Sequence, residues 1–322
     1  KLCVITHLGR PKEGEFDIDL SVLPIKKWFE KRLNEEIHLI NNFENIPDNV
    51  CFMENIRFFN GENDNDKNLS EQIAKAFDVY VMDAFATAHR AAASTFGAIK
   101  FSKNACSGLL FSEEIKNLES ALKENKQILS IVGGSKISTK LKVIHNLLPN
   151  SSAIVVGGGI ANTFLKAAGN PIGKSIVEDD MLDKAKELLL TNKIVLPEHV
   201  YVAETPQSNK VDLIPVEDVP ENQMILDIEL NENKISQNEE YIIWNGPLGI
   251  FEIDKFSNGT KQLIAFLENS KSKVIAGGGE TLFAINKFSD TSKFHYVSTA
   301  GGAFLEYLSG NKLPSIEALR LK

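Results

Sequence analysis

The chain has 322 residues, of which 43% are hydrophobic and 24% are charged, and its formal net charge is −8 at pH 7. This length favours two domains over one, and the proportions are those of an ordinary globular protein. The acidic balance argues against nucleic acid or an anionic membrane surface as the main partner. No apolar run is long enough to cross a membrane, and three cysteines are too few for a disulfide framework or a zinc site, so we expect a cytoplasmic protein.

Apolar strands alternate with helical patterns through the first part of the chain. We expect strands at residues 2–6, 37–40, 50–58 and 79–82, and helices at residues 23–33, 71–77 (capped by Ser70) and 112–123. Such alternation predicts an α/β domain with a parallel sheet. Because the chain starts directly with an apolar strand, we also expect this first domain to be incomplete at its N-terminus.

A second series of strands and helices begins after residue 124. We expect strands at 128–132 and 154–156, around residues 194, 201, 213, 224 and 242, and at 274–276 and 296–299, with helices at 181–190 and 256–267. The helix at 112–123 then marks the junction between two domains. The fold class that this pattern predicts is two doubly wound α/β domains with parallel sheets.

The stretch Ile128–Lys140 is the strongest single signal in the chain. Its apolar first half suits a strand buried on both faces, and two glycines then allow a tight turn into a helix capped by Ser135 or Ser138. Lys136 and Lys140 would share one face of the first helical turn, so amides, helix dipole and two ammonium groups would meet at a phosphate site. Taken alone, an ordinary strand-to-helix turn with two solvated lysines is an equally good interpretation.

The same pattern recurs three times in the second half. Glycine triplets or pairs follow apolar strands at residues 154–159, 274–279 and 296–302. Four such strand ends meet at one edge of an open sheet, where these folds bind ligands. Asn162 and Leu282 stand where a dinucleotide-binding fingerprint has its third glycine, and none of the loops is a Walker A motif. The sequence therefore predicts a nucleotide site of a less common kind.

Two strand ends in the first half carry cations, namely His7 with Arg10 and His89 with Arg90. Arginine's planar fork suits phosphate and carboxylate oxygens, although each pair alone is better explained as surface charge on a loop. Arg57 near Glu54 is equally consistent with a buried structural pair. Together with the glycine-rich second half, the cations indicate two substrates: a small anion on the first domain and a nucleotide on the second.

Seven ordered motifs spread over the whole chain resemble the signatures of one family, phosphoglycerate kinase of the bacterial type. They are His7–Pro11, Glu54–Phe58, Asp83–Arg90, Val132–Lys136, Trp244–Glu252, Gly277–Thr281 and Ser298–Gly302. The resemblance implies a monomeric glycolytic kinase that transfers a phosphoryl group between 1,3-bisphosphoglycerate and ADP, giving 3-phosphoglycerate and ATP, with Mg²⁺. It also implies a phosphoglycerate-binding domain at residues 1–124, a nucleotide-binding domain at 125–305, and a segment at 306–322 that returns to the first domain.

The resemblance also assigns roles to individual residues. The phosphoglycerate would be held by His7, Leu8, Gly9, Arg10, Arg90 and Lys126. The nucleotide would be held by Lys140, Gly157, Gly158, Asn245, Glu252 (on the ribose), Gly278, Gly279, Glu280 and Thr281. The transferring phosphoryl group would be stabilised by Lys136, Gly279 and Gly302, and the metal would be bound by Glu280.

Several residues depart from the family pattern. Glu280 replaces an Asp, Ala300 and Ala86 each replace a Gly, and residues 227–229 lack the Gly-Pro that usually follows Asp-Ile. The resemblance also implies a first strand with an Asp and an Asn that bind substrate, followed by an Arg that stabilises the transition state. These have no counterpart in this sequence, so we expect little or no turnover. The alternatives are a dehydrogenase, which would need the missing third glycine, and a relative that binds nucleotide without turnover.

Overall fold

The computed structural model describes residues 1–122, 127–235 and 238–322, which divide into two compact units. Unit 1 comprises residues 1–113 and 312–322, and unit 2 comprises residues 114–311. The first division falls inside helix α4 (Leu109–Leu122), where we had expected the whole helix to belong to the first domain. The returning segment starts at Lys312 rather than at residue 306.

Unit 1 contains two small parallel sheets. Strands β1 (Leu2–Val4), β2 (His38–Ile40) and β3 (Val50–Met53) pair in the order β1-β3-β2, while β4 (Tyr80–Met82) pairs with β5 (Ala105–Ser107). We had expected one strand over residues 50–58, but the chain turns after β3. The Asn55 side chain accepts a hydrogen bond from the Arg57 amide at 3.1 Å and starts a 3-10 turn at Ile56–Phe58.

The helices of unit 1 begin and end at recognisable signals. They are α1 (Leu23–Leu33), α2 (Lys67–Lys75), α3 (Ala98–Phe101), a π-helical turn at Ala93–Gly97, and α11 (Pro314–Arg320). Pro24 lies in the first turn of α1, which ends at Asn34 in the left-handed conformation. Helix α2 is capped by Asp66, which accepts from the Leu69 amide at 2.9 Å, so the expected cap at Ser70 is wrong.

Unit 2 is built on a six-stranded parallel sheet in the order β14-β13-β12-β6-β7-β8. Its strands are β6 (Ile128–Val132), β7 (Ser151–Val156), β8 (Ile194–Val195), β12 (Tyr241–Asn245), β13 (Lys273–Gly277) and β14 (Tyr296–Ser298). The chain passes outward from β6 to β8 on one side and from β12 to β14 on the other. The neighbours β6 and β12 therefore mark the point where the winding reverses, and a ligand crevice is expected beyond their carboxyl ends.

The middle part of the unit 2 sequence forms a separate antiparallel sheet, which we had not expected. Strands β9 (His199–Ala203), β10 (Asp212–Pro215) and β11 (Met224–Ile228) pair in the order β10-β9-β11. We had placed these strands in the parallel βα series. The connection from β9 to its neighbour β10, residues 204–211, is too short for the crossover that parallel pairing requires.

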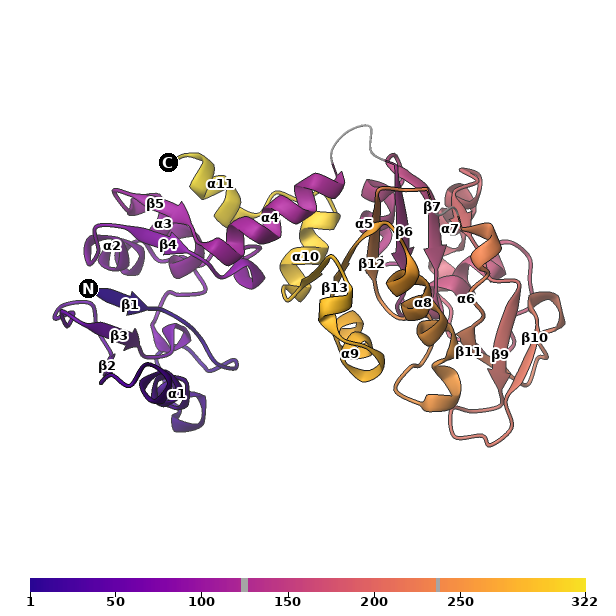
Figure 1. Cartoon of the computed structure of the whole chain (residues 1–322), viewed down its shortest axis with the longest axis horizontal. Helices are drawn as coiled ribbons and strands as arrows, with labels where there is room; N and C mark the ends of the chain where they lie inside the picture. The colour runs from indigo at the N-terminus through magenta and orange to yellow at the C-terminus, as the bar shows by residue number, and fades with distance from the viewer. Residues whose placement is uncertain (123–126, 236–237) are drawn as a thin grey trace. The chain divides into compact units, whose positions relative to one another are not determined.

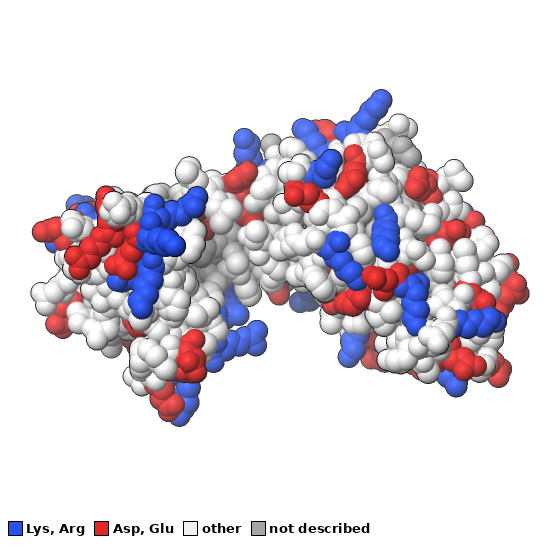
Figure 2. All heavy atoms as spheres, turned by 60° about the horizontal axis from the view of Figure 1, so that its bottom comes forward, with Lys and Arg blue, Asp and Glu red and all other residues white. Residues whose placement is uncertain are grey.

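Seven helices or parts of helices cover the sheets of unit 2. Besides the end of α4 they are α5 (Leu141–Leu147), α6 (Gly158–Ala167), α7 (Leu182–Leu189), α8 (Asn258–Asn269), α9 (Gly279–Phe288) and α10 (Gly301–Leu308). Figure 1 shows β12, β6 and β7 running side by side, with α8 drawn in front of them. In Figure 2 basic and acidic side chains are interspersed over the visible face of unit 2.

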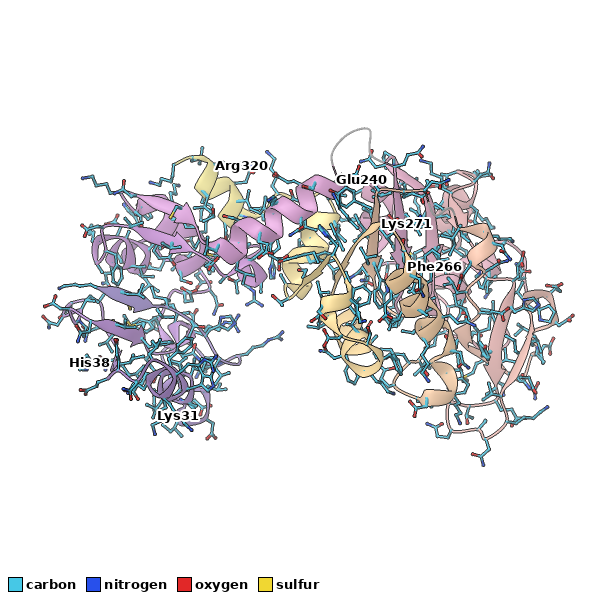
Figure 3. All side chains as sticks on the ribbon, viewed as in Figure 1. Lys31, His38, Glu240, Phe266, Lys271 and Arg320 are labelled. Atoms are coloured by element: carbon cyan, nitrogen blue, oxygen red, sulfur yellow. The ribbon has the colours of Figure 1, made fainter. Side chains whose placement is uncertain are left out.

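The core of unit 2 fills the space between the parallel sheet and its helices. All five residues of β6 are buried, as its apolar run predicted, and the Ser130 hydroxyl is paired with that of Ser151 at 2.8 Å. Trp244 of β12 and Phe266 of α8 (labelled in Figure 3) belong to the same apolar cluster. None of the helices in the described residues is long and apolar enough to cross a membrane.

Helix α11 fastens the C-terminal segment to unit 1. The buried Ser315 donates its hydroxyl to the Thr95 carbonyl at 2.7 Å and its amide to the Ala88 carbonyl at 3.2 Å. Both bonds join the last helix to the polypeptide around the π-helical turn. The end of the chain is therefore an integral part of unit 1.

We expect Ser315→Ala to destabilise unit 1 by about 1–2 kcal/mol, because the buried Thr95 carbonyl loses its donor. The measurement is amide hydrogen exchange, which should speed up in peptides covering residues 88–102 and 312–322. Ser309→Ala is the matched control, since that hydroxyl bonds the Leu305 carbonyl within α10. Unchanged exchange in both unit 1 peptides would contradict this role.

Candidate active site

Two glycine turns meet where the strand order of unit 2 reverses. The Gly133 amide donates to the Asn245 carbonyl at 2.9 Å, and a Cβ at Gly133 would come within 1.9 Å of the Pro247 carbonyl oxygen. Gly246 has a φ of +101°, and its added Cβ would approach the Gly133 oxygen to 2.3 Å. Only glycine fits at either position, so the two strand ends touch and open a crevice above them.

The first part of this crevice is a small polar pocket of about 260 Å³. It is lined by Gly134, Ser135, Thr139, Lys140, Asn245, Gly246, Gly278, Gly279, Glu280, Thr281, Gly301 and Leu305. Helix α9 starts here at Gly279, after Gly278 with a φ of +105°, and the first amides of a helix have no partner within it. The pocket therefore offers amide donors and the positive end of a helix dipole to an anion.

Lys140 brings a positive charge to this pocket. Burial lowers the pKa of its ammonium group to about 8, an effect that the nearby Glu280 carboxylate partly offsets. Its Nζ donates to Asn245 Oδ1, while Asn245 Nδ2 donates to the Gly277 carbonyl at 2.7 Å. Thr281 Oγ1 accepts from the Gly246 amide at 2.8 Å. These bonds hold the Lys140 ammonium group, the Asn245 side-chain amide and the Thr281 hydroxyl against the glycine loops that line the pocket.

The loop between β6 and α5 differs from our expectation. Helix α5 begins only at Leu141, so Lys136 and Lys140 lie in the preceding turn and do not share a helical face. Ser138 does not cap the helix either, because its amide and hydroxyl donate to Glu178 at 2.9 and 2.6 Å. Lys140 lines the polar pocket, whereas Lys136 is exposed and is not among the residues that line it.

A second, mostly apolar pocket of about 320 Å³ adjoins the first and shares Gly134, Ser135 and Glu280 with it. Its walls include Gly158, Gly159, Asn162, Ile176, Met224, Leu248 and Ile250, with the exposed Glu252 also lining it. Gly158 has a φ of +62°, and its added Cβ would lie 2.7 Å from the Gly134 oxygen. A polar pocket that continues into an apolar one of this size suits phosphates followed by a ribose and a base.

Two expected residues lie beside these pockets rather than in them. Gly157 packs beneath, where an added Cβ would come within 2.6 Å of Leu248 Cδ2. Gly302 is exposed in the first turn of α10, while its neighbour Gly301 lines the polar pocket.

Asp227, at the end of β11, supports one wall of the apolar pocket. Its buried carboxylate accepts from the Ile228 amide and, in α8, from the Gly259 amide, each at 2.9 Å. The carboxylate thus caps α8 from a neighbouring strand. Burial raises the Asp227 pKa to about 7, against the lowering effect of the amides of Gly259, Ile228 and Asn258 and of the charge on Lys261.

Unit 1 contains a cluster of cations at the end of β1. His7, Arg57 and Arg90 line a cavity of about 530 Å³ that also runs along β4. Burial lowers the His7 pKa, and the charges of Arg57 and Arg90 lower it further. Burial likewise lowers the Arg57 pKa, with added repulsion from Arg90 and Arg10. No carboxylate among the described residues forms an ion pair with these three arginines, so the cluster is suited to an anionic ligand.

Arg57 is a candidate binding residue that sequence reasoning missed. We had considered it a structural partner of Glu54, but Glu54 accepts from the Ser21 hydroxyl at 2.7 Å and from the amides of Val22 and Asn55. Arg57 donates instead to the Gly9 carbonyl at 2.5 Å and lines the cavity. Arg57 lies in the motif Glu54–Phe58, which resembles a family signature. That resemblance was the signal that could have identified Arg57 as a binding residue, whereas the expected pairing with Glu54 pointed to a structural role.

Leu8, Gly9 and Arg10 follow His7 in the loop after β1, but they are not among the residues that line the cavity. Gly9 adopts a φ of +62°, and the Leu8 carbonyl accepts from Asn55 Nδ2 at 2.7 Å, which fixes the loop that carries Arg10. His89 is not among the residues that line the cavity. Lys126 lies outside the described residues.

The fold is that of a two-unit α/β protein, with a polar pocket that adjoins an apolar one in unit 2 and a cavity lined by His7, Arg57 and Arg90 in unit 1. The family model described as phosphoglycerate kinase matches residues 1–311. A phosphoglycerate kinase of Francisella philomiragia is 45% identical over 99% of this chain and 85% of its own length, and one of Coxiella burnetii is 42% identical with the same coverage.

Solved structures lead to the same family. The chain matches the structure of phosphoglycerate kinase from Coxiella burnetii with a TM-score of 0.93 and 42% identity, and the crystal structure of the Pyrococcus horikoshii enzyme with a TM-score of 0.80 and 25% identity. Each match covers 99% of this chain and 86% of the other. The chain belongs to the phosphoglycerate kinase family, which confirms both the resemblance and the α/β fold class.

We expect Lys140→Ala to weaken ADP binding by about ten- to a hundredfold, because a charge-assisted bond to phosphate is lost in a partly buried site. Adenosine, which has no phosphate, should bind equally well to both proteins in calorimetry. Lys142→Ala, an exposed lysine of α5, is the matched control. An equal loss for adenosine and ADP would mean that Lys140 supports the loop rather than the phosphates.

We expect the Asp227 carboxylate to make unit 2 less stable as the pH rises. Its folded pKa of about 7 exceeds the ordinary value of 3.8, so the folded state holds the proton more tightly and its advantage disappears as pH rises through 7. The free energy of unfolding of Asp227→Asn minus that of the parent should therefore increase from pH 4 to pH 8, by roughly 4 kcal/mol at most.

The measurement follows urea unfolding by the fluorescence of Trp244 in a Trp28→Phe background, since the chain has two tryptophans. Asp254→Asn serves as the control, because that exposed carboxylate has a lowered pKa from its bond to Lys287, so the variant should not gain stability relative to the parent over this pH range. A pH-independent difference between the parent and Asp227→Asn would contradict the raised pKa.

Proposed function

We propose that each unit holds one substrate of the reaction of this family, with the nucleotide on unit 2 and the phosphoglycerate on unit 1. The chain is a kinase that transfers a phosphoryl group between 1,3-bisphosphoglycerate and ADP, giving 3-phosphoglycerate and ATP in glycolysis. The observation that supports assigning one substrate to each unit is the difference between the residues that line the two sites. Unit 2 joins a glycine-lined polar pocket to an apolar one, and unit 1 gathers arginines that have no carboxylate partner among the described residues.

The nucleotide phosphates occupy the polar pocket in this proposal. Lys140 supplies a positive charge, Gly278 and Gly279 supply the glycine turn and the amides at the start of α9, and Thr281 and Asn245 hold that turn in shape. The base and ribose lie in the apolar pocket against Gly158, with Gly157 beneath it and Glu252 placed to accept from the ribose hydroxyls.

The phosphoglycerate occupies the cation cluster of unit 1. His7, Arg10 and Arg90 bind its carboxylate and phosphate oxygens. We add Arg57 to this set because it lines the cavity together with His7 and Arg90, and Arg10 is near enough for its charge to act on Arg57. Leu8 and Gly9 keep the loop of Arg10 in place through the bonds to Asn55 and Arg57. The assignment of Lys126 stays a prediction.

The chemistry needs positioning and charge more than acid–base catalysis. A β-phosphate oxygen of ADP attacks the phosphorus of the acyl phosphate, and the bond to the carboxylate oxygen of 3-phosphoglycerate breaks. The attacking oxygen is already anionic, and the leaving oxygen takes the electron pair of the broken P–O bond and departs as a carboxylate, so no proton has to move and no protein nucleophile is required. Amides at Gly279 and Gly302 and the ammonium group of Lys136 are our candidates for stabilising the charge in transit.

A magnesium ion fits the donors beside the polar pocket. Glu280 is exposed at the start of α9 and lines both pockets. The described residues contain no cluster of three or more acidic, histidine or cysteine side chains that could hold a metal, so Glu280 would act with the nucleotide phosphates. Mg²⁺ is commonly bound by one or two carboxylates plus substrate phosphates, and when bound it neutralises phosphate charge. A monomeric state, a cytoplasmic location and the lack of nucleic-acid or membrane partners stay predictions.

The deciding experiment is a coupled assay for ATP-dependent phosphorylation of 3-phosphoglycerate, run beside calorimetry with ADP. Turnover together with ADP binding supports the proposal. ADP binding without turnover would identify a relative that binds nucleotide but does not catalyse the reaction. Failure to bind ADP would refute the assignment of unit 2.

We expect Arg57→Ala to raise the KM for 3-phosphoglycerate by about tenfold or more, because a guanidinium contact to an anion is lost. The dissociation constant of ADP should not change, since Arg57 belongs to unit 1. Arg32→Ala is the control, as this arginine lies over the Trp28 ring of α1, 5.5 Å from its centroid. A KM equal to that of the parent would remove Arg57 from the binding set.

A further inference from the structure

One residue that lines the apolar pocket of unit 2 has a buried polar atom with no hydrogen-bond partner among the described residues. Asn162, in α6, is 3% exposed and lines this pocket one helical turn beyond Gly158 and Gly159. Its Nδ2 donates to the Ile176 carbonyl at 3.2 Å, which settles the orientation of the amide because the opposite orientation would set two oxygens against each other. No donor among the described residues lies within hydrogen-bond distance of Asn162 Oδ1.

A buried carbonyl oxygen without a donor is unfavourable, and each such atom in a native protein calls for an explanation. The other polar side chains that line the pocket do not share this condition. Asp227 already accepts from two backbone amides, and Glu252 and Glu280 are exposed. Ser135, which is also exposed, lines the polar pocket as well. Among the polar side chains that line the apolar pocket, Asn162 is therefore the one with a buried acceptor that has no donor in the described residues.

The position of Asn162 relates it to the base rather than to the phosphates. Residues three and four apart lie on one face of a helix, so Asn162 follows Gly159 and Gly158 along the face that lines the pocket. The phosphate end of the crevice is marked by Gly134, Ser135 and Glu280, which the two pockets share. A base placed on these two glycines would lie beside Asn162.

We propose that Asn162 is a specificity-determining residue, whose Oδ1 accepts a hydrogen bond from the 6-amino group of adenine. The inference rests on the proposed function, in which the apolar pocket holds the base of ADP. Adenine has a donor at position 6, whereas hypoxanthine and guanine have a carbonyl oxygen there. Those bases would place an acceptor against Oδ1 and leave it unpaired. Sites built to hydrogen-bond a substrate group discriminate strongly against analogues that lack it.

The test compares nucleotides that differ at position 6. Calorimetry on the full chain measures ADP, IDP and purine riboside 5′-diphosphate, which carry an amino group, a carbonyl oxygen and a hydrogen at that position. We expect ADP to bind roughly tenfold more tightly than either analogue. In Asn162→Leu, which keeps the approximate size but removes the acceptor, the ratio should fall to near one through weaker ADP binding. Asn170→Leu is the matched control, since its Nδ2 donates to the Leu165 carbonyl just beyond the same helix and away from the pocket.

Equal binding of ADP and IDP by the parent protein overturns this assignment, whatever the variants do. An unchanged ratio in a folded Asn162→Leu protein overturns it as well. If that variant does not fold, the parent's ranking of the three nucleotides decides alone. Failure of the parent to bind any of them would refute the proposed function itself, whereas binding without preference leaves the proposed function standing and removes only the role of Asn162.

Discussion

The close approach of two strand ends, at Gly133 and Gly246, is the constraint on which the polar pocket of unit 2 depends. Both turns lack a Cβ, so the backbone of one loop rests on the backbone of the other. The arrangement brings the loop after β6, the loop after β12 and the start of α9 around one small volume. Any side chain at these two glycines would push the loops apart, and Lys140 would lose its contact with Asn245.

Charge is handled in opposite ways in the two units. In unit 2, a single half-buried ammonium group is held by an amide oxygen and tempered by Glu280, while neutral backbone donors surround it. In unit 1, like charges are gathered at the end of β1, and the pKa values of His7 and Arg57 are lowered first by burial and then by the charges of neighbouring arginines. The positive charges repel one another when no anion is present. A bound anion removes this repulsion, so the cluster favours ligand binding at the expense of the stability of unit 1 without ligand.

Much of this organisation was readable from sequence because it depends on local patterns. Apolar runs located the strands of the parallel sheet, and glycines after them located the crevice, since both signals lie within a few residues of one another. The errors came from interactions between distant residues. Ser138 pairs with Glu178 rather than capping α5, and Glu54 satisfies the amides of Val22 and Asn55 rather than pairing with Arg57. The antiparallel sheet was missed because strand pairing direction is set by connection length and packing, which apolar periodicity does not record.

The docking of α11 on unit 1 also has a consequence for the order in which the protein is made. Ser315 bonds Thr95 across 220 residues of sequence, and all of unit 2 lies between them. During synthesis on the ribosome, unit 1 stays open until residues 312–322 emerge, whereas the strands of unit 2 are by then available to pair. Closing so long a loop carries a large entropic cost in a flexible chain, and a folded unit 2 shortens the distance that the chain must search. Helix α11 thus docks on unit 1 late in folding. In nascent chains that stop before α11, unit 1 could not complete its packing.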